Sequence, residues 1–175
     1  SIDAAQEESV AQTRSFSSMA VVLQQMAGVL AKETLSSSNI LSKICQDLID
    51  DYADLAQSLG ENSDIKKFFF LGSDALYGIA CEAMLKMKEM SLSYSEAFHM
   101  LEFRHGPMSM VSEDSLVVGL ISPDAADQDI SILKDMEAMG ATILSIGQVD
   151  ADFKHHIKLP DDIPSWNTPI LHLPV

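Results

Sequence analysis

Two carboxylates and a lysine stand at helical spacing within the segment LGSDALYGIACEAMLKMKEM, residues 71–90. Glu82, Lys86 and Glu89 are four and three positions apart, so a helix would carry all three on one face. A carboxylate held beside a cation stays ionised and can accept a proton from carbon. The alternative is a solvated stripe whose ion pair contributes only about 0.3 kcal/mol. The spacing by itself leaves both interpretations open.

A second group of polar side chains lies in the sequence Glu-Phe-Arg-His-Gly-Pro, residues 102–107. The Gly-Pro pair predicts a sharp turn, and His105 just before it could act as an acid or a base near neutral pH. A purely structural role for this histidine is the alternative. Arg104 could pair with Glu102 or Glu96, or bind a phosphate group.

Two further segments are candidates for ligand contact. An apolar run ends at Gly-Ser, which places Ser73 between a predicted strand and the N-terminus of a helix. That geometry favours anions, although the segment matches neither a P-loop nor a dinucleotide fingerprint. The polar run EESVAQTRSF, residues 7–16, opens another predicted helix, for which Ser9 is the expected N-cap.

The elements that must position these residues follow an alternating order. Amphipathic spacing predicts helices over 8–34 and 40–59, separated by the break SSSN at 36–39. After them, short apolar runs predict buried strands, helical periodicity returns between the strands, and residues 95–111 are expected to be helical or irregular. The predicted strands are 66–73, 115–122, 141–147 and 155–160, and the helices between them are 76–90 and 127–140. Such alternation predicts an α/β fold with a parallel sheet, whose ligands bind beyond the carboxyl ends of the strands.

Composition narrows the classes of function. The chain has 175 residues, enough for one domain with a real core, and a formal net charge of -15. That charge argues against nucleic acid and anionic membranes as partners. An anionic substrate would need a binding site whose local features overcome the overall negative field. The two cysteines are expected to be buried free thiols. With no signal peptide and no membrane-length apolar run, a cytoplasmic location is expected, and the remaining histidines show no metal-ligand spacing.

Taken together, the segments LGSD, ACEAMLKMKE, EAF and LEFRHGP resemble the pattern LGRG, ALEGALKLKE, EAY and GELKHGP of the SIS (sugar isomerase) family, and SVAQTRSF resembles its GVASTKAF. The likeness extends to the isomerase half of glutamine–fructose-6-phosphate transaminases and to free-standing phosphosugar isomerases and fructosamine-phosphate deglycases. It implies a three-layer α/β/α sandwich with a parallel, flavodoxin-like sheet preceded by two helices. Residues 1–38 would end a preceding SIS lobe, and residues 39–175 would form a second lobe that is truncated at its C-terminus.

The resemblance also implies roles for individual residues. Glu89 matches the carboxylate that moves a proton between C1 and C2 of a sugar phosphate through an enediol(ate). Lys86 matches a substrate-binding lysine, and His105 matches a ring-opening histidine that reaches the site of the adjacent subunit. Val10 and Gln12 match sugar-contacting positions.

Two departures from the pattern bear on the branch of the family. Where the transaminase has Ser, this chain has Gln12, and Arg104 replaces a Lys. The first favours the isomerase, deglycase or deaminase relatives, and the second is shared with the deglycase-like branch. The implied ligand is a sugar phosphate or amino-sugar phosphate, and Ser73 and Arg104 are the further candidates for binding it.

The implied protein is an enzyme that uses no cofactor or metal and forms a homodimer with a shared site. The isolated chain is expected to be inactive. The alternative function is a non-catalytic SIS module that senses phosphosugars.

Overall fold

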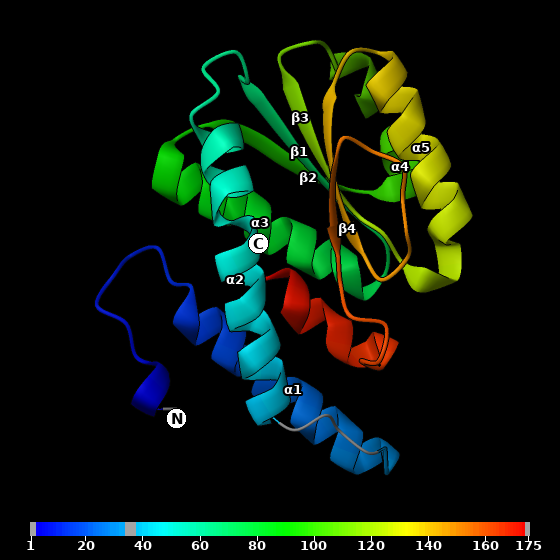
Figure 1. The fold of residues 1–175 in the computed structure, drawn as a ribbon. Helices are drawn as coiled ribbons and strands as arrows, with labels where there is room; N and C mark the ends of the chain where they lie inside the picture. The colour runs from blue at the N-terminus through cyan, green and yellow to red at the C-terminus, as the bar shows by residue number, and fades with distance from the viewer. Residues whose placement is uncertain (1–2, 34–37, 174–175) are drawn as a thin grey trace.

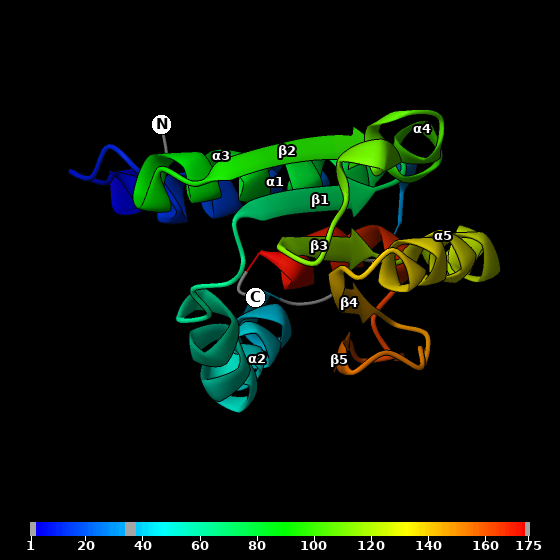
Figure 2. The same ribbon diagram turned by 90° about the horizontal axis from the view of Figure 1, so that it is seen from above.

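The computed structural model of the chain describes residues 3–33 and 38–173, so residues 36–37 of the predicted break lie outside them. Five strands form one parallel sheet in the order β2-β1-β3-β4-β5, which is the flavodoxin-like order. Figures 1 and 2 show helices covering both faces of this sheet. The strands are β1 Lys67–Gly72, β2 Tyr94–His99, β3 Ser115–Leu120, β4 Thr142–Gly147 and β5 His155–Lys158; the α-helices are α1 Arg14–Ala31, α2 Ser38–Gly60, α3 Ala75–Ser91, α4 Met100–Arg104 and α5 Ala126–Ala138; the 3-10 helices are η1 Asp3–Ala5, η2 Pro107–Met110, η3 Pro123–Ala125 and η4 Ser165–His172.

Two hydrophobic clusters hold the three layers together. One lies on the sheet face covered by α2, α3 and η4 and includes Phe70, Val118 and Ile146. The other lies on the face covered by α4 and α5 and includes Phe69 and Val117. Alternate residues of β1 and β3 enter opposite clusters, as the two-residue period of a strand requires. The predicted three-layer α/β/α fold is confirmed.

The connection from β1 to α3 depends on Gly72. A Cβ atom at this position would lie 2.6 Å from the carbonyl oxygen of Leu76. Since only glycine avoids that collision, the first turn of α3 can sit directly on the end of β1. Asp74 in the same turn has φ of 50° and ψ of -122°, a conformation that costs a side-chain-bearing residue about 1–3 kcal/mol.

Two elements differ from the sequence prediction. The segment expected to be helical or irregular contains the strand β2, which lies at the edge of the sheet beside β1. The helices α4 and η2 of this segment agree with the prediction, but the strand was missed because most of its positions are only half-buried and it lacks the continuous apolar run of a central strand. The first helix begins at Arg14 instead of residue 8, so Ser9 is not its N-cap.

The apolar stripe of α1 is largely uncovered within the chain. Leu23 is 64 % exposed, Val29 74 % and Leu30 82 %, whereas Phe16 packs against the core. Within the described residues, no helix has the length and apolar character needed to cross a membrane.

Candidate functional site

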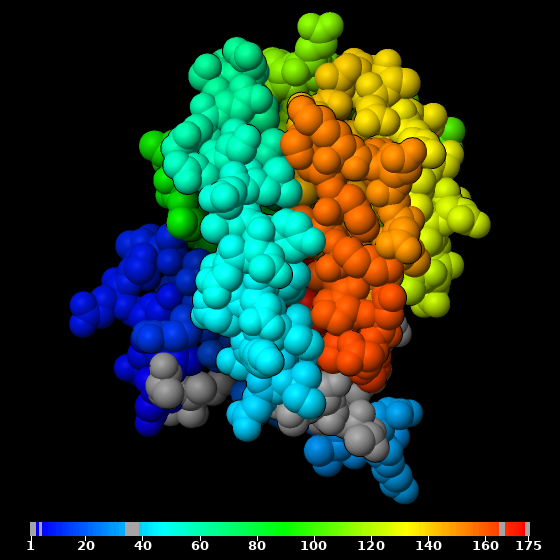
Figure 3. Space-filling model, viewed as in Figure 1, coloured from blue at the N-terminus to red at the C-terminus, as the bar shows by residue number. Residues whose placement is uncertain are grey.

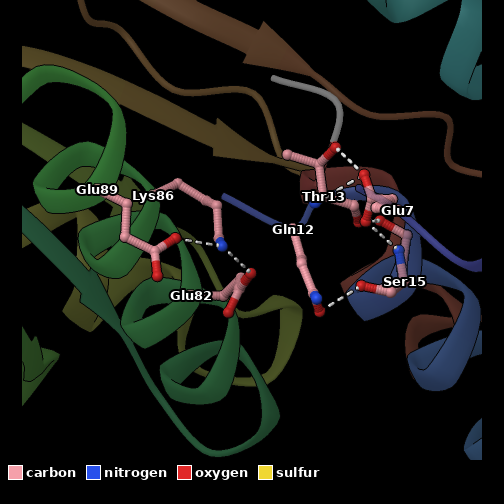
Figure 4. A network of polar contacts seen from close by, with 8 residues as sticks. Glu7, Gln12, Thr13, Ser15, Glu82, Lys86 and Glu89 are labelled. Atoms are coloured by element: carbon pink, nitrogen blue, oxygen red, sulfur yellow. Dashed lines mark hydrogen bonds and ion pairs between the residues drawn. The ribbon is translucent and has the colours of Figure 1, made fainter. Parts of the chain in front are cut away.

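Lys86 lies between two carboxylates on one face of α3. Its Nζ is 2.7 Å from Oε2 of Glu89 and 3.4 Å from Oε1 of Glu82. The hydrogen bond with Glu89, supported by the charges of both carboxylates, raises the pKa of Lys86. Side-chain exposure is 18 % for the lysine, 29 % for Glu89 and 13 % for Glu82. We call these three residues the acid–lysine cluster; the one-face arrangement predicted from their spacing is present (Figure 4).

The neighbouring strand β2 fixes the part of α3 that carries the cluster. The buried Ser95 donates a hydrogen bond from its hydroxyl to the carbonyl of Met84, at 3.0 Å. Lys88 pairs with Glu96 across the same boundary at 3.7 Å. These contacts orient α3 along β2 and leave the face of Lys86 turned away from the strand.

Glu7 organises the loop that precedes α1. Its carboxylate accepts hydrogen bonds from the backbone N–H of Ser15 at 2.7 Å and of Thr13 at 3.3 Å. These bonds, chiefly the one from Ser15, lower the pKa of Glu7 to about 2. Arg14 also donates from its guanidinium to the carbonyl of Gln6. Glu7 therefore accepts hydrogen bonds from backbone N–H groups at the start of α1, which is the role expected of Ser9. Because Glu7 lies well before the helix in the sequence, a local sequence pattern does not indicate this role.

The two sugar-contacting candidates lie in this same loop. Val10 is 91 % exposed, and the side-chain oxygen of Gln12 accepts a hydrogen bond from the hydroxyl of Ser15 at 2.9 Å. Both ribbon views place the segment before α1 toward the C-terminal end of α3 (Figures 1 and 2). In the view of Figure 4, Gln12 lies between Glu82 and Ser15.

The remaining candidates lie at the carboxyl edge of the sheet. Ser73 follows β1, and its carbonyl accepts the N–H of Leu76 at 3.0 Å. His105 follows α4 and is exposed. Arg104 binds Asp135 of α5 at 2.8 Å. The sequence suggested Glu102 or Glu96 as the partner of Arg104, but Arg104 pairs with neither, and Glu96 pairs with Lys88 instead. Asp135 comes close to Arg104 because α4 and α5 share one face of the sheet.

Glu89 and His105 lie at opposite ends of the sheet within one chain. The strand β2 separates the end of α3 from the start of α4, and its six residues span about 20 Å. Figure 2 shows α4 and the C-terminal end of α3 at opposite ends of β2. Ser73 is likewise a full helix length from Glu89, since α3 runs back along the sheet. The structure therefore groups Glu89 and Lys86 with Glu82, and places His105, Arg104 and Ser73 elsewhere.

The other ionisable groups form no metal site among the described residues. Cys45 and Cys81 are free and half-buried. Tyr77 at the start of α3 stacks on His99 at the end of β2, with ring centroids 3.8 Å apart. A hydrogen bond with Cys81 raises the pKa of Tyr77.

The fold agrees with a known domain family. The SIS domain model matches residues 63–153, which is more than half of the chain, and the chain belongs to this family. The matched region contains the acid–lysine cluster, Ser73, Arg104 and His105.

Three similar proteins extend the comparison. A glutamine–fructose-6-phosphate aminotransferase (isomerizing) of Caldanaerobacter subterraneus is 27 % identical over 182 residues, which cover 94 % of this chain and 30 % of the relative. The solved tagatose-6-phosphate ketose/aldose isomerase of Escherichia coli is 25 % identical with a TM-score of 0.76, and covers 94 % of this chain and 48 % of that one. The glucosamine-6-phosphate deaminase of Thermotoga maritima is 26 % identical with a TM-score of 0.75, over 90 % and 48 %. The chain thus spans less than a third of the aminotransferase and about half of each solved chain.

Proposed function

We propose that this chain supplies the proton-transferring base and its lysine to an enzyme that isomerises a sugar phosphate or an amino-sugar phosphate. The observation that carries the proposal is Lys86 held 2.7 Å from Glu89 on a helix face. The isomerase, deaminase and aminotransferase names of the similar proteins support the same class of chemistry.

The proposed chemistry assigns one task to each member of the cluster. Glu89, as a carboxylate, removes a proton from C1 or C2 next to the carbonyl, and returns it to the other carbon after an enediol(ate) forms. Lys86 is held as a cation by its two carboxylate partners, so it can offset negative charge that develops on the substrate oxygens. Glu82, the least exposed of the three, keeps the ammonium group in place.

A homodimer with a shared site completes the proposal. His105 is at the far end of β2 from Glu89, so a histidine that opens the sugar ring beside Glu89 would come from a second chain. The uncovered apolar stripe on α1 offers surface for such an association. We also propose that residues 1–38 end one SIS lobe, that residues 39–175 belong to the next, and that the protein is cytoplasmic.

The substrate branch follows from Gln12. A glutamine in this loop, in place of the serine of the transaminase pattern, favours the isomerase, deglycase or deaminase relatives over amino transfer from glutamine. Ser73 and Arg104 lie about 20 Å from the acid–lysine cluster of the same chain, which is too far for one sugar phosphate to reach both. Any contact of these two residues with the phosphate of a substrate at Glu89 would therefore come from the second chain that supplies His105.

Solvent-deuterium exchange tests the proposal directly. Full-length protein incubated in deuterated water with fructose 6-phosphate or glucosamine 6-phosphate should place deuterium at the exchanging carbon, and Glu89→Gln should reduce this at least a hundredfold while phosphosugar binding persists. Glu61→Gln, which changes an exposed carboxylate at the end of α2, is the matched control. Normal exchange in Glu89→Gln would remove the assigned base. Phosphosugar binding with no exchange in the wild-type protein would instead support the sensing module.

A further inference from the structure

The loop that precedes α1, residues 6–13, lies beside the end of α3 that carries the acid–lysine cluster (Figures 1 and 2). Figure 3 shows this blue segment at the molecular surface, next to green atoms at the place where Figure 1 draws the C-terminal end of α3. In the close view, Gln12 of the loop lies between Glu82 and Ser15 (Figure 4). A substrate that reaches Glu89 therefore meets this loop as well as the helix.

Glu7 closes the loop onto the start of α1. Its Oε2 accepts the backbone N–H of Ser15 at 2.7 Å, and its Oε1 accepts both the backbone N–H and the hydroxyl of Thr13 at 3.3 Å. The bond from Ser15 is the largest cause of the low pKa of Glu7, about 2. Glu7 is thus ionised at neutral pH, and an ionised acceptor makes roughly twice as strong a hydrogen bond as a neutral one.

Ser15 links this restraint to Gln12. Its backbone N–H is bound by Glu7, while its hydroxyl donates to the side-chain oxygen of Gln12 at 2.9 Å. Gln12 is otherwise an exposed side chain. If such a side chain is free, the entropy lost when it becomes ordered weakens substrate binding. An anchored Gln12 avoids most of that cost.

We propose that Glu7 is a positioning residue for the substrate, which acts through Ser15 to hold Gln12 in place beside the acid–lysine cluster before the phosphosugar binds. This role rests on the proposed function, because the substrate is the sugar phosphate that reaches Glu89. Glu7 contributes to binding and does not touch the reacting atoms, so its loss raises KM and leaves kcat unchanged. A role confined to the stability of α1 would instead lower the free energy of unfolding and leave KM unchanged.

Deuterium exchange by the full-length protein, measured over a range of fructose 6-phosphate or glucosamine 6-phosphate concentrations, gives KM and kcat. We expect Glu7→Gln, which replaces one acceptor oxygen with a donor, to raise KM about tenfold and to change kcat by less than about twofold. Ser15→Ala keeps the N–H for Glu7 and removes the bond to Gln12, so it should raise KM about threefold. In a Gln12→Ala background, Ser15→Ala should have no further effect. Glu8→Gln, which changes the neighbouring exposed carboxylate, is the matched control and should alter neither constant.

An unchanged KM in Glu7→Gln, or a fall in kcat as large as the rise in KM, would overturn the positioning role. A Ser15→Ala effect that persists in the Gln12→Ala background would overturn it too, since Ser15 would not act through Gln12. If the wild type binds the sugar phosphates without exchange, the proposed chemistry fails, and calorimetry decides the positioning role: their Kd should rise about tenfold in Glu7→Gln, and an unchanged Kd rejects it. If Glu7→Gln does not fold, Ser15→Ala and its comparison with Gln12→Ala decide the outcome.

Discussion

Burial of the neutral imidazole of His172 makes the stability of the protein sensitive to mild acid. Folding lowers the pKa of this side chain from 6.5 to about 4, so the unfolded chain binds the proton more tightly than the folded chain does. The resulting stabilisation is fully present above pH 6.5 and is lost as the pH falls from 6.5 to about 4. The complete loss amounts to about 3 kcal/mol, and about 2 kcal/mol of it is gone by pH 5.

The wild type alone does not isolate this effect. At a net charge of -15, acidification also relieves repulsion among carboxylates, which stabilises the folded state. Burial lowers the pKa of His155 and of His156 as well, so they add a loss of the same sign. Both effects cancel when the unfolding free energy of the wild type is compared with that of a variant that lacks only the titrating group of His172, because the two proteins share them.

His172→Asn is that variant, because the Asn amide can donate to the carbonyl of Thr168, as Nδ1 of His172 does. Urea unfolding followed by circular dichroism at pH 7.5, 6 and 5 gives the free energy of unfolding of each protein. We expect the advantage of the wild type over His172→Asn to shrink by about 2 kcal/mol between pH 7.5 and pH 5. An advantage that stays constant with pH, or a measured His172 pKa above 6, would refute the reasoning.

Two further predictions concern the loops before α1 and α3. Asp74→Gly should raise the free energy of unfolding by roughly 1 kcal/mol, because glycine adopts the positive φ without strain. Asp74→Asn should recover little of this gain in the same urea assay, and equal gains from both variants would assign the effect to charge. The amide chemical shift of Ser15 should titrate with a midpoint near pH 2, because Glu7 accepts its N–H and has a pKa of about 2. Glu7→Gln should abolish that titration, and a Ser15 titration that persists in the variant would exclude Glu7 as its source.

The sequence predicted well the elements whose pattern of residue types follows directly from local structure. The strands β1, β3 and β4 are central and buried on both faces, so their apolar runs mark them directly. The helix α3 and the shared face of Glu82, Lys86 and Glu89 follow from a period that needs no tertiary information.

The elements that were missed depend on neighbours distant in the sequence. The edge strand β2 is covered on one side by α3, so its pattern is mixed. The amphipathic spacing predicted a helix at α1, but whether a neighbouring surface covers its apolar stripe is not encoded in the helix itself, and within the chain this stripe is largely exposed. The start of α1 depends on Glu7, which reaches its N-terminus through a loop.

The sequence by itself determined the parallel α/β architecture, the acid–lysine cluster and the resemblance to the SIS family, because local periodicity and motif spacing carry all three. Only the tertiary structure decided that Glu89 and His105 lie at opposite ends of the sheet, that Arg104 binds Asp135, and that His172 is buried. The physical reason is that a parallel sheet brings together the ends of strands that are distant in sequence, while each helix–strand unit separates its own two ends by about 20 Å.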